Sequence, residues 1–573
     1  MSYHTSAIVI GGGIGGLAAA SAALRHFDQV TLVDKDDLAS KIASETILEA
    51  RRCPAIVLWE SYEEARALTQ STKKRRSGVP HYTQPHILLA GGSRALERLL
   101  PGFTKELCSR GARSYDAGKG LFVYDFGAPF QRGIDAGVEV FAASRRLINE
   151  VCQDVVLEQG KDRLILREKT KVAGLFWERP SSQPESYNVT NRVRGVQGVI
   201  LNSGEKLRAD LVIVSNGRTS QLPSWLKEVG LEVPPQLKVD SQMNYASRWM
   251  RLPEDFDPEK EFYSALVNAR PAMARGGVAL VLEDNLLQIS MNGFEGERAP
   301  LDHEGWMEYA ASLPDQTLFN LAQRCEPIGP ITRFASAPNT AHQYHTMKFP
   351  EGLVVIGDAF AALNPFYGQG MSVAAQQAVL LEETLGKVLS GKSGETRIRH
   401  AVRATLSPRL HKLLHKKVNL AWQMSTCEDM RWPGVKIEGM AKPTNAMYNY
   451  LDAIMLSCQQ SKKVWKQLLR VTQFVTPPSG MFTPLMVMYA TKNIVFTKKK
   501  KLKSALVNDG DEVGEVPQAP RFANPIRTTT SIPPFTAASI SRSDTTDTWS
   551  SDGGKDIDFI TVEQPGVRGA VAV

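Results

Sequence analysis

A glycine-rich turn near the start of the chain constrains the fold more than any other feature of the sequence. Residues 7–10 are apolar and predict a strand, and the alanine-rich residues 17–27 predict a helix. Between them lies Gly11-Gly12-Gly13-Ile14-Gly15-Gly16, and a second strand is predicted at 29–33. A strand, a glycine turn and a helix in this order are typical of a parallel, doubly wound sheet that binds a dinucleotide.

Three of these glycines have the GxGxxG spacing, and each has its own physical role. Gly11 permits a tight turn, Gly13 lets the backbone approach a pyrophosphate, and Gly16 lets the helix lie close to the sheet. The N-terminus of the helix then faces the phosphate charge. Asp34 follows the second strand, 23 residues after Gly11, where a carboxylate can accept hydrogen bonds from a ribose. The motif predicts a dinucleotide site but does not separate FAD from NAD.

A second motif, far downstream, separates these two cofactors. A strand predicted at 353–356 leads into Gly357-Asp358-Ala359, and Asn364-Pro365-Phe366-Tyr367-Gly368-Gln369-Gly370-Met371 opens a helix. Asp358 is placed to accept hydrogen bonds from ribityl hydroxyls, and the positive end of the helix points at the flavin. The candidate cofactor-binding residues here are Gly357, Asp358, Pro365, Gly368, Gly370 and Met371.

The pair of motifs resembles the FAD-dependent monooxygenases of the aromatic-hydroxylase superfamily, in which GDA and NPxxGQGM form the second flavin motif. Other stretches resemble the squalene-epoxidase-like branch of that superfamily, which includes bacterial polyether-pathway epoxidases. The resemblance covers residues 6–37 and 75–495. The branch-like stretches are GVPH at 78–81, HILLAGG at 86–92, LE at 96–97, LPG at 100–102, YASR at 245–248, Trp422, EDMR at 428–431 and FTP at 482–484.

The resemblance also implies an arginine near the flavin, and one motif departs from it. Within residues 144–147 we choose Arg145 as the cofactor-binding arginine, and a structural ion pair is the alternative. The acidic mid-chain motif of the superfamily begins here with Asp210 but continues as Val214-Ser215-Asn216-Gly217-Arg218. In the superfamily that the chain resembles, this motif helps to dock the nicotinamide and to close the cofactor site around the pyrophosphate, so the change affects what we expect for both. It leaves a non-catalytic flavin-binding protein as an alternative.

The order of predicted elements indicates an α/β fold with an inserted domain. We expect a Rossmann-like FAD-binding domain at 1–225 and 350–390, with an insertion at 39–74 that relatives lack. A sheet-bearing substrate domain is expected at 226–349 and a helical C-terminal region at 391–497. The basic run and the Ser- and Thr-rich residues that follow predict a disordered tail at 498–573.

No window of the sequence has the roughly 20 consecutive apolar residues that a membrane-spanning helix needs. Residues 481–496 come nearest, but Pro484 and Lys492 interrupt them and a lysine run at 498–501 follows. This segment fits contact with a membrane surface or a helix packed on the body, and we favour the packed helix. Because no signal-peptide pattern precedes the first strand, we expect a cytoplasmic protein, with 481–503 as the segment that would associate with membranes.

Charge, cysteine spacing and missing motifs exclude several other functions. The 68 Lys and Arg exceed the 60 Asp and Glu, but the basic residues form no aromatic-interleaved stripe, so nucleic-acid binding is not indicated. The six cysteines are widely spaced, which predicts neither a disulfide framework nor a metal site. The Gly-x-Ser-x-Gly, P-loop and HExxH motifs are absent, as is the WxWxIP motif of flavin halogenases.

These observations lead to the hypothesis of an FAD-dependent monooxygenase that uses NAD(P)H and O2 on an apolar small molecule. We favour alkene epoxidation of a polyene or prenylated secondary metabolite, because no base that would deprotonate a phenol stands out. Aromatic hydroxylation and flavin-dependent prenyl-chain reduction are the alternatives. No catalytic residue is assigned, since His81 and His86 fit an acid–base role and a structural role equally well.

Overall fold

The computed structural model describes residues 5–38, 84–177, 195–335, 337–392 and 395–507. Several predictions concern residues outside these ranges. They are the insertion at 39–74, the branch-like stretch at 78–81 with His81, and the tail from residue 508.

A five-stranded parallel sheet carries the first glycine turn. Its strand order is β19-β11-β1-β2-β7, so that the first strand of the chain lies at its centre. Ala7 pairs with Leu211 on one side of that strand and with Val30 on the other. The five strands are β1 (Ser6–Ile10), β2 (Gln29–Val33), β7 (Leu164–Arg167), β11 (Leu211–Val214) and β19 (Leu353–Val355).

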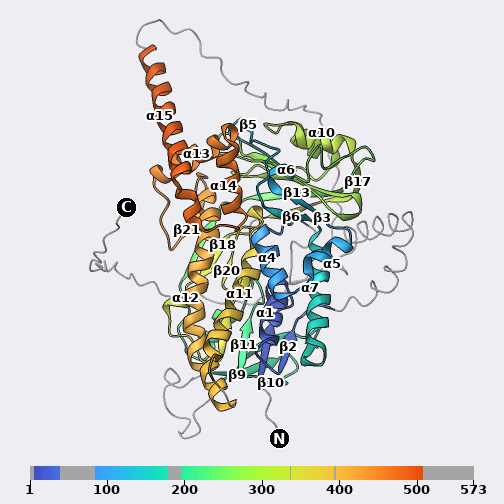
Figure 1. The fold of residues 1–573 in the computed structure, drawn as a ribbon, viewed down its shortest axis with the longest axis vertical. Helices are drawn as coiled ribbons and strands as arrows, with labels where there is room; N and C mark the ends of the chain where they lie inside the picture. Colours follow the sequence, from blue (N-terminus) through green and yellow to red (C-terminus); the bar gives the residue numbers. More distant parts are fainter. Residues whose placement is uncertain (1–4, 39–83, 178–194, 336, 393–394, 508–573) are drawn as a thin grey trace, which may run out of the picture. The chain divides into compact units, whose positions relative to one another are not determined.

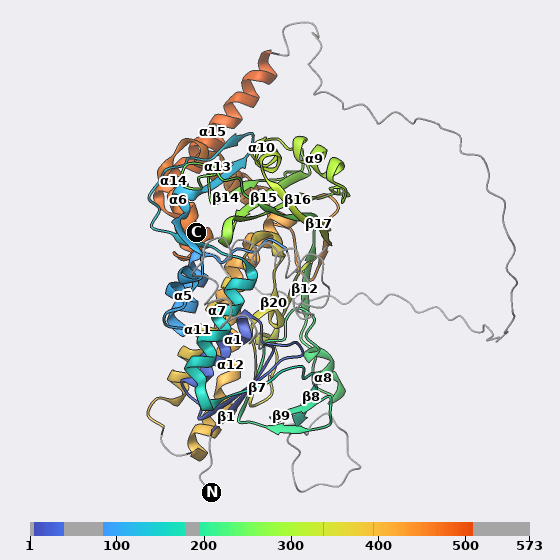
Figure 2. The ribbon, with the colours of Figure 1, turned by 90° about the vertical axis from the view of Figure 1, so that its right-hand side faces the viewer.

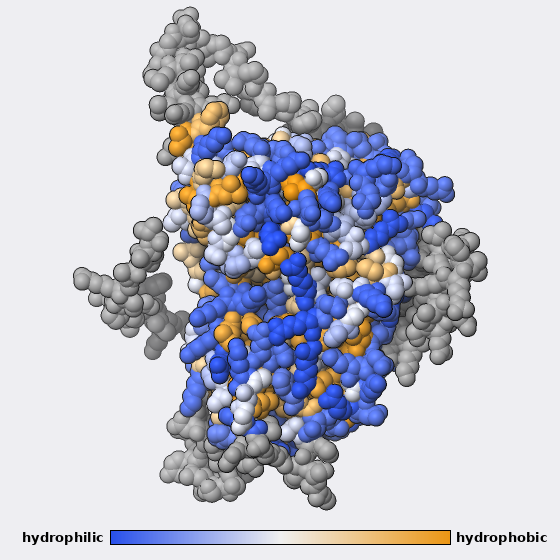
Figure 3. Space-filling model, viewed as in Figure 1, coloured by the Kyte–Doolittle hydropathy of each residue, from blue (hydrophilic) through white to orange (hydrophobic). Residues whose placement is uncertain are grey.

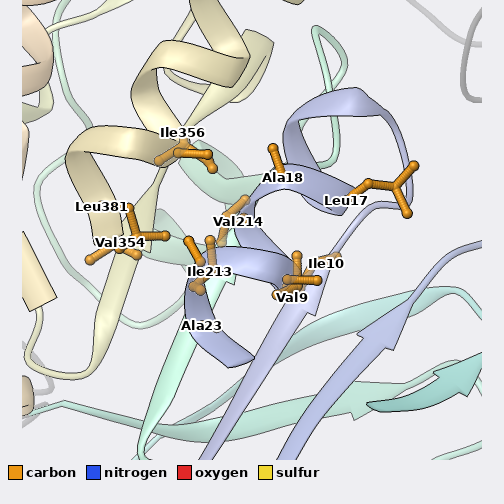
Figure 4. Close-up of a cluster of buried hydrophobic side chains, with 14 of the residues drawn as sticks. Val9, Ile10, Leu17, Ala18, Ala23, Ile213, Val214, Val354, Ile356 and Leu381 are labelled. Carbon is orange, nitrogen blue, oxygen red and sulfur yellow. The ribbon is translucent and has the colours of Figure 1, made fainter. Parts of the chain in front are cut away.

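Helices that cover this sheet bury its apolar side chains. Ten of the eleven residues of α1 (Ile14–Leu24) are buried, and α1 packs against α7 and α11 (Figure 1). Its small residues allow this close packing: Figure 4 shows Ala18 and Ala23 in one apolar cluster with Val9, Ile213 and Val354 of the strands. The other helices of this region are α4 (Ala90–Leu99), α5 (Phe103–Ser109), α7 (Arg145–Gly160), α11 (Gly370–Leu389) and α12 (Glu395–Asp429).

A second, seven-stranded sheet has the order β17-β13-β16-β15-β14-β4-β5. One of its faces packs against α9 (His303–Ala311) and α10 (Thr317–Arg324), as Figure 2 shows. Two of its strands, β4 and β5, precede residue 226. They join the sheet because β4 pairs in parallel with β14 and β5 pairs with β4. The strands are β4 (Leu121–Asp125), β5 (Ala128–Pro129), β13 (Asn244–Arg251), β14 (Ser264–Val267), β15 (Arg275–Val281), β16 (Leu286–Gly293) and β17 (Glu326–Ala335).

Three smaller sheets and the C-terminal helices complete the described fold. The sheets are β10-β9-β8, β20-β18-β12-β21 and β3-β6. Their strands are β3 (Arg113–Asp116), β6 (Glu139–Ala142), β8 (Val172–Trp177), β9 (Val196–Leu201), β10 (Lys206–Arg208), β12 (Gln236–Asp240), β18 (Asn339–His342), β20 (Ala361–Ala362) and β21 (Lys436–Glu438). The remaining helices are α6 (Ala117–Gly120), α8 (Leu222–Glu228), α13 (Asn445–Gln460), α14 (Lys462–Thr472) and α15 (Pro484–Val507).

The predicted α/β fold, with a Rossmann-like sheet, a second sheet and a helical C-terminal part, is confirmed. Strand β2 has the predicted bounds, and α11 begins at Gly370, within the motif that was predicted to open a helix. The segment at 481–496 contributes to a helix, α15, that buries Met486 and Ala490 against its neighbours. Within the described residues, no helix is both long enough and apolar enough to cross a membrane.

Candidate active site

The turn between β1 and α1 has a geometry that requires glycine. Gly11 has a φ of +104°, and a Cβ there would lie 2.5 Å from the carbonyl oxygen of Ser215. A Cβ on Gly16 would lie 1.6 Å from the carbonyl oxygen of Gly11. At Gly13, by contrast, a Cβ would have no neighbour within 4 Å, although this residue is the N-cap of α1. The helix N-terminus therefore borders open space of the kind that a phosphate group needs.

Asp34 lies directly beside this turn. Its buried carboxylate accepts hydrogen bonds from the backbone N–H of Gly12 and, at 2.8 Å, from that of Asp36. The structure thus brings the predicted acidic residue and the glycine turn together. Binding of a ribose by Asp34 stays a prediction.

The second motif meets the first one, although the two are far apart in the sequence. A Cβ on Gly15 would lie 2.9 Å from Oγ of Ser215, 3.2 Å from Cβ of Ala374 and 3.8 Å from Cα of Gly357. Gly357 has a φ of +65° and donates its N–H to the side chain of Gln377. The start of α1, the end of β11 and the start of α11 therefore border one site.

Asp358 and two arginines share this site. Burial raises the pKa of Asp358, and the positive charges of Arg218 and Arg145 act to lower it. A Cβ on Gly370 would lie 3.8 Å from Oδ1 of Asp358, so the carboxylate is next to the N-terminus of α11. Met371 is the next residue of that helix.

The two arginines are held differently. Arg145 is the buried first residue of α7, and its Nη1 lies 3.4 Å from Oδ1 of Asn149. Arg218 donates hydrogen bonds of 2.6 Å to the carbonyl oxygens of Pro338 and Leu363. Our sequence reasoning placed Arg218 in the altered motif but gave it no role. Its position after the carboxyl end of β11, a central strand, was the available signal.

The turn before α11 is fixed by a buried carboxylate. Pro365 begins a short 3-10 helix (Pro365–Tyr367), and Gly368 follows it with a φ of +63°. A Cβ on Gly368 would lie 2.1 Å from Cγ2 of Ile87. Asp429, at the end of α12, accepts a hydrogen bond of 2.8 Å from the hydroxyl of Tyr367.

The same carboxylate accepts two further hydrogen bonds. The side-chain amides of Asn339 and Asn364 donate to Asp429 at 2.8 and 3.0 Å. Asp429 has no exposed surface, and burial raises its pKa to about 6, against the opposing effect of its donors. The sequence offered no local signal for this role, because Asp429 and its partners come from α12, β18 and the turn before α11.

A cavity of about 750 Å³ adjoins this turn. Residues Pro365–Gln369 form part of its wall, and one face of the seven-stranded sheet and helices α12, α13 and α14 contribute further residues. Most of its lining is apolar. Its charged residues are paired, since Arg270 binds Asp125 at 2.6 Å and Glu428 at 2.9 Å. His86 also lines the cavity, with Nδ1 2.7 Å from the carbonyl oxygen of Gln84.

The site fits FAD on three structural observations. Gly13 leaves room at the N-terminus of α1 for a phosphate. The buried Oδ1 of Asn216, which follows the carboxyl end of β11, has no hydrogen-bond partner in the described part of the chain. Oε1 of Gln369, in the second motif, likewise has no partner among the residues that the structure describes. In the part of the chain that the structure describes, no group of three or more His, Cys, Asp or Glu side chains is placed to hold a metal.

Comparison with known proteins identifies the cofactor. Residues 159–408 match the protein-family model described as "FAD binding domain", and this range includes the second motif. The chain contains an FAD-binding domain. FAD is therefore its cofactor, in agreement with the sequence prediction.

Two similar proteins complete the comparison. Protein Rv3254 of Mycobacterium tuberculosis is 24% identical over 438 residues, which cover 74% of this chain and 80% of the relative. The solved structure of the flavin-dependent brominase Bmp2 superposes with a TM-score of 0.54 at 10% identity, covering 86% of this chain and 100% of Bmp2. This likeness shows that the chain shares its overall fold with Bmp2.

Proposed function

We propose that this protein is an FAD-dependent monooxygenase that uses NAD(P)H and O2 to insert one oxygen atom into an apolar small molecule. The observation that carries this proposal is the apolar cavity, because Gly368 and Gln369 of the second flavin motif are part of its wall. A molecule in the cavity lies beside the residues that the sequence assigns to the flavin. FAD, once reduced by NAD(P)H, supplies the activation of O2 and the transfer of oxygen.

The residues of the cavity bind the substrate and exclude water. Leu266 and Leu280 of the sheet face apolar residues of α12–α14 such as Met424 and Leu468, so an apolar substrate gains from burial there. Exclusion of water protects the reduced flavin from unproductive side reactions. Arg270 is neutralised by two carboxylates, so the wall presents little net charge.

An alkene is the substrate group that this wall favours. An electrophilic oxygen adds to a carbon–carbon double bond without help from a protein nucleophile, so correct positioning suffices. Phenol hydroxylation benefits from a base, and burial raises the pKa of Tyr245 in the cavity wall, which makes it a poor one. We therefore propose epoxidation of a polyene or prenylated secondary metabolite.

Aromatic hydroxylation is a second candidate because His86 lines the cavity. Its Nδ1 lies 2.7 Å from the carbonyl oxygen of Gln84, and when Nδ1 carries the proton of the neutral ring, Nε2 carries the lone pair. Prenyl-chain reduction would use the same cavity without O2. The three reactions differ in their products and are separated by one experiment.

The test is incubation of the holoprotein with NADPH or NADH and labelled O2. The substrates are polyenes, prenylated aromatics and simple phenols, and mass spectrometry follows the incorporated atom. One labelled oxygen at a former double bond supports the proposal. Label only in phenol rings would establish aromatic hydroxylation, and an alkene saturated without label would establish reduction. A His86→Ala variant that keeps full alkene oxidation would separate the first two reactions further.

We also propose that an apolar patch beside this cavity contacts a membrane with anionic lipids. Phe482, Met488 and Phe496 are 57, 58 and 68% exposed, and Figure 3 shows apolar residues gathered over α15 and its neighbours. The sequence of α15 continues into the lysine run at 498–501, which complements anionic headgroups. Phe482 and Met447 belong to both the patch and the cavity lining, which suits entry of an apolar substrate from lipid. The patch consists of Met447, Phe482, Val487, Met488, Val495 and Phe496.

Co-sedimentation with vesicles tests the membrane contact. We expect more binding to phosphatidylcholine–phosphatidylserine vesicles than to phosphatidylcholine alone, and loss of binding when Phe482, Met488 and Phe496 are all replaced by Ser. The matched control replaces three exposed apolar residues elsewhere, Val233, Met273 and Leu301, by Ser. Equal loss in both triple variants, or no binding by the unaltered protein, would refute the contact.

A further inference from the structure

The seven-stranded sheet presents one face to the cavity and the other to α9 and α10. Along β16 the side chains alternate between these faces. Leu287, Ile289 and Met291 belong to the apolar core under α9 and α10, whereas Ser290 and Asn292 line the cavity. The cavity floor is therefore a strand face that carries polar groups within otherwise apolar surroundings.

Asn292 differs from the other polar residues of this floor. Its side chain is 1% exposed, and among the described residues neither Oδ1 nor Nδ2 has a hydrogen-bond partner. In contrast, the hydroxyl of Ser290 accepts a 2.8 Å hydrogen bond from Ser247, and Asn268 donates to Asp125 at 3.0 Å. A buried amide without partners is costly, so such a group in a cavity wall points to a ligand.

The neighbours of Asn292 keep space open beside its amide. In the sheet register, Asn292 lies between Tyr245 of β13 and Gly276 of β15. A Cβ on Gly276 would lie 2.5 Å from the carbonyl oxygen of Val267 and 3.0 Å from Nδ2 of Asn292, so a larger residue there would crowd both the neighbouring backbone and the amide. The hydroxyl of Tyr309 binds the backbone carbonyl of Asn292 at 3.0 Å, which fixes the backbone and leaves the side chain for the cavity.

We propose that the amide of Asn292 recognises a neutral head group that offers a hydrogen-bond acceptor and a donor side by side. Amides, lactams and enolised β-dicarbonyls have this pattern. A neutral group is favoured over a carboxylate, because Arg270 binds Asp125 and Glu428, and Arg431 binds Asp452 at 2.8 Å. The substrate is then an apolar body with one such head. This inference rests on the proposed function and deepens it by naming the substrate class.

Equilibrium dialysis of three probes against the holoprotein tests the inference without turnover. The probes share one apolar body: 4-pentylbenzamide has a donor and an acceptor, methyl 4-pentylbenzoate has only an acceptor, and 4-pentyltoluene has neither. We expect the amide to bind about tenfold more tightly than the hydrocarbon, with the ester in between, since one or two neutral hydrogen bonds are gained.

Asn292→Leu, which keeps the branched shape of the side chain but removes its polar atoms, should reduce this preference to less than twofold and leave the affinity for the hydrocarbon unchanged or higher. Ser290→Ala is the matched control, because Ser290 is on the same strand and face but already has a partner. It should keep the tenfold preference. Asn292→Ala provides a second test of the same preference if the leucine variant does not fold.

Three results would overturn the inference. The first is equal binding of amide and hydrocarbon to the unaltered protein. The second is an amide preference that survives in the Asn292 variants. The third is loss of bound FAD in those variants, which would show that Asn292 contacts the cofactor. Failure of the monooxygenase assay changes none of these binding results, so the two proposals fail separately.

Discussion

Replacing Asp429 by Asn should change how the stability of this protein depends on pH. The carboxylate of Asp429 is fully buried and accepts hydrogen bonds from Tyr367, Asn339 and Asn364. Burial nevertheless dominates and raises its pKa from 3.8 in the unfolded chain to about 6 in the native state. The native state therefore binds the proton more tightly than the unfolded chain does.

The sign and size of the effect follow from these two pKa values. As the pH falls from 8 through 6 towards 4, Asp429 becomes protonated in the native state first, and the free energy of unfolding rises. The difference between 3.8 and about 6 corresponds to about 3 kcal/mol at 1.36 kcal/mol per pH unit. Asn at this position does not titrate. We therefore expect the wild-type protein to gain up to about 3 kcal/mol relative to Asp429→Asn over this pH range.

Urea unfolding at several pH values, followed by tryptophan fluorescence, measures this difference for the apoprotein and the holoprotein. Comparison with the variant cancels the titration of all other groups. Tyr367→Phe provides a second check, because it removes one donor to the carboxylate and should move the titration to higher pH. If the wild type instead lost stability relative to Asp429→Asn on acidification, its donors would outweigh burial and the reasoning would be wrong.

Three further predictions concern the cofactor site. Gly16→Ala should abolish FAD binding, measured by flavin released on acid precipitation, because the added Cβ has no room against the preceding carbonyl. Gly368→Ala should weaken FAD binding at least tenfold, and Ile87→Ala should partly restore it by removing the 2.1 Å contact; no restoration would contradict this cause. Glu283 accepts a 2.7 Å hydrogen bond from the backbone N–H of Ser144, the N-cap of α7. Glu283→Gln should therefore lower the free energy of unfolding by about 1 kcal/mol, measured by calorimetry, and weaken FAD binding a few-fold, measured by flavin fluorescence.

The sequence was sufficient to predict the elements that depend on local chemistry. The turn at Gly11 needs a positive φ, and Gly16 needs contact with the preceding turn, so both positions are recognisable without a structure. The strand at 29–33 was predicted with its observed bounds, and the helix that the second motif opens begins at Gly370 within that motif.

Features that depend on contacts between distant segments were not predicted. Asp429 binds residues of β18 and of the turn before α11, and no spacing in the sequence relates them. Strand β4 joins the second sheet through its pairing with β14, which lies more than 100 residues later. Short strands that pair over such distances give no signal beyond their own apolar character.

The cofactor site and the proposed substrate site depend on different kinds of sequence feature, and this explains why the sequence predicted the first site but not the residues of the second. A dinucleotide is held largely by backbone groups, so its site constrains glycines at fixed spacings within one strand–turn–helix unit. A substrate is selected by side chains that several elements contribute to one cavity. Asn292 on β16, Tyr245 on β13 and Leu468 on α14 share that cavity, yet their spacing in the sequence is arbitrary. An apolar strand that carries one buried, unpartnered amide has the same alternating pattern as a purely structural strand. Only the assembled sheet separates them, because it shows which face lies against helices and which face a substrate can reach.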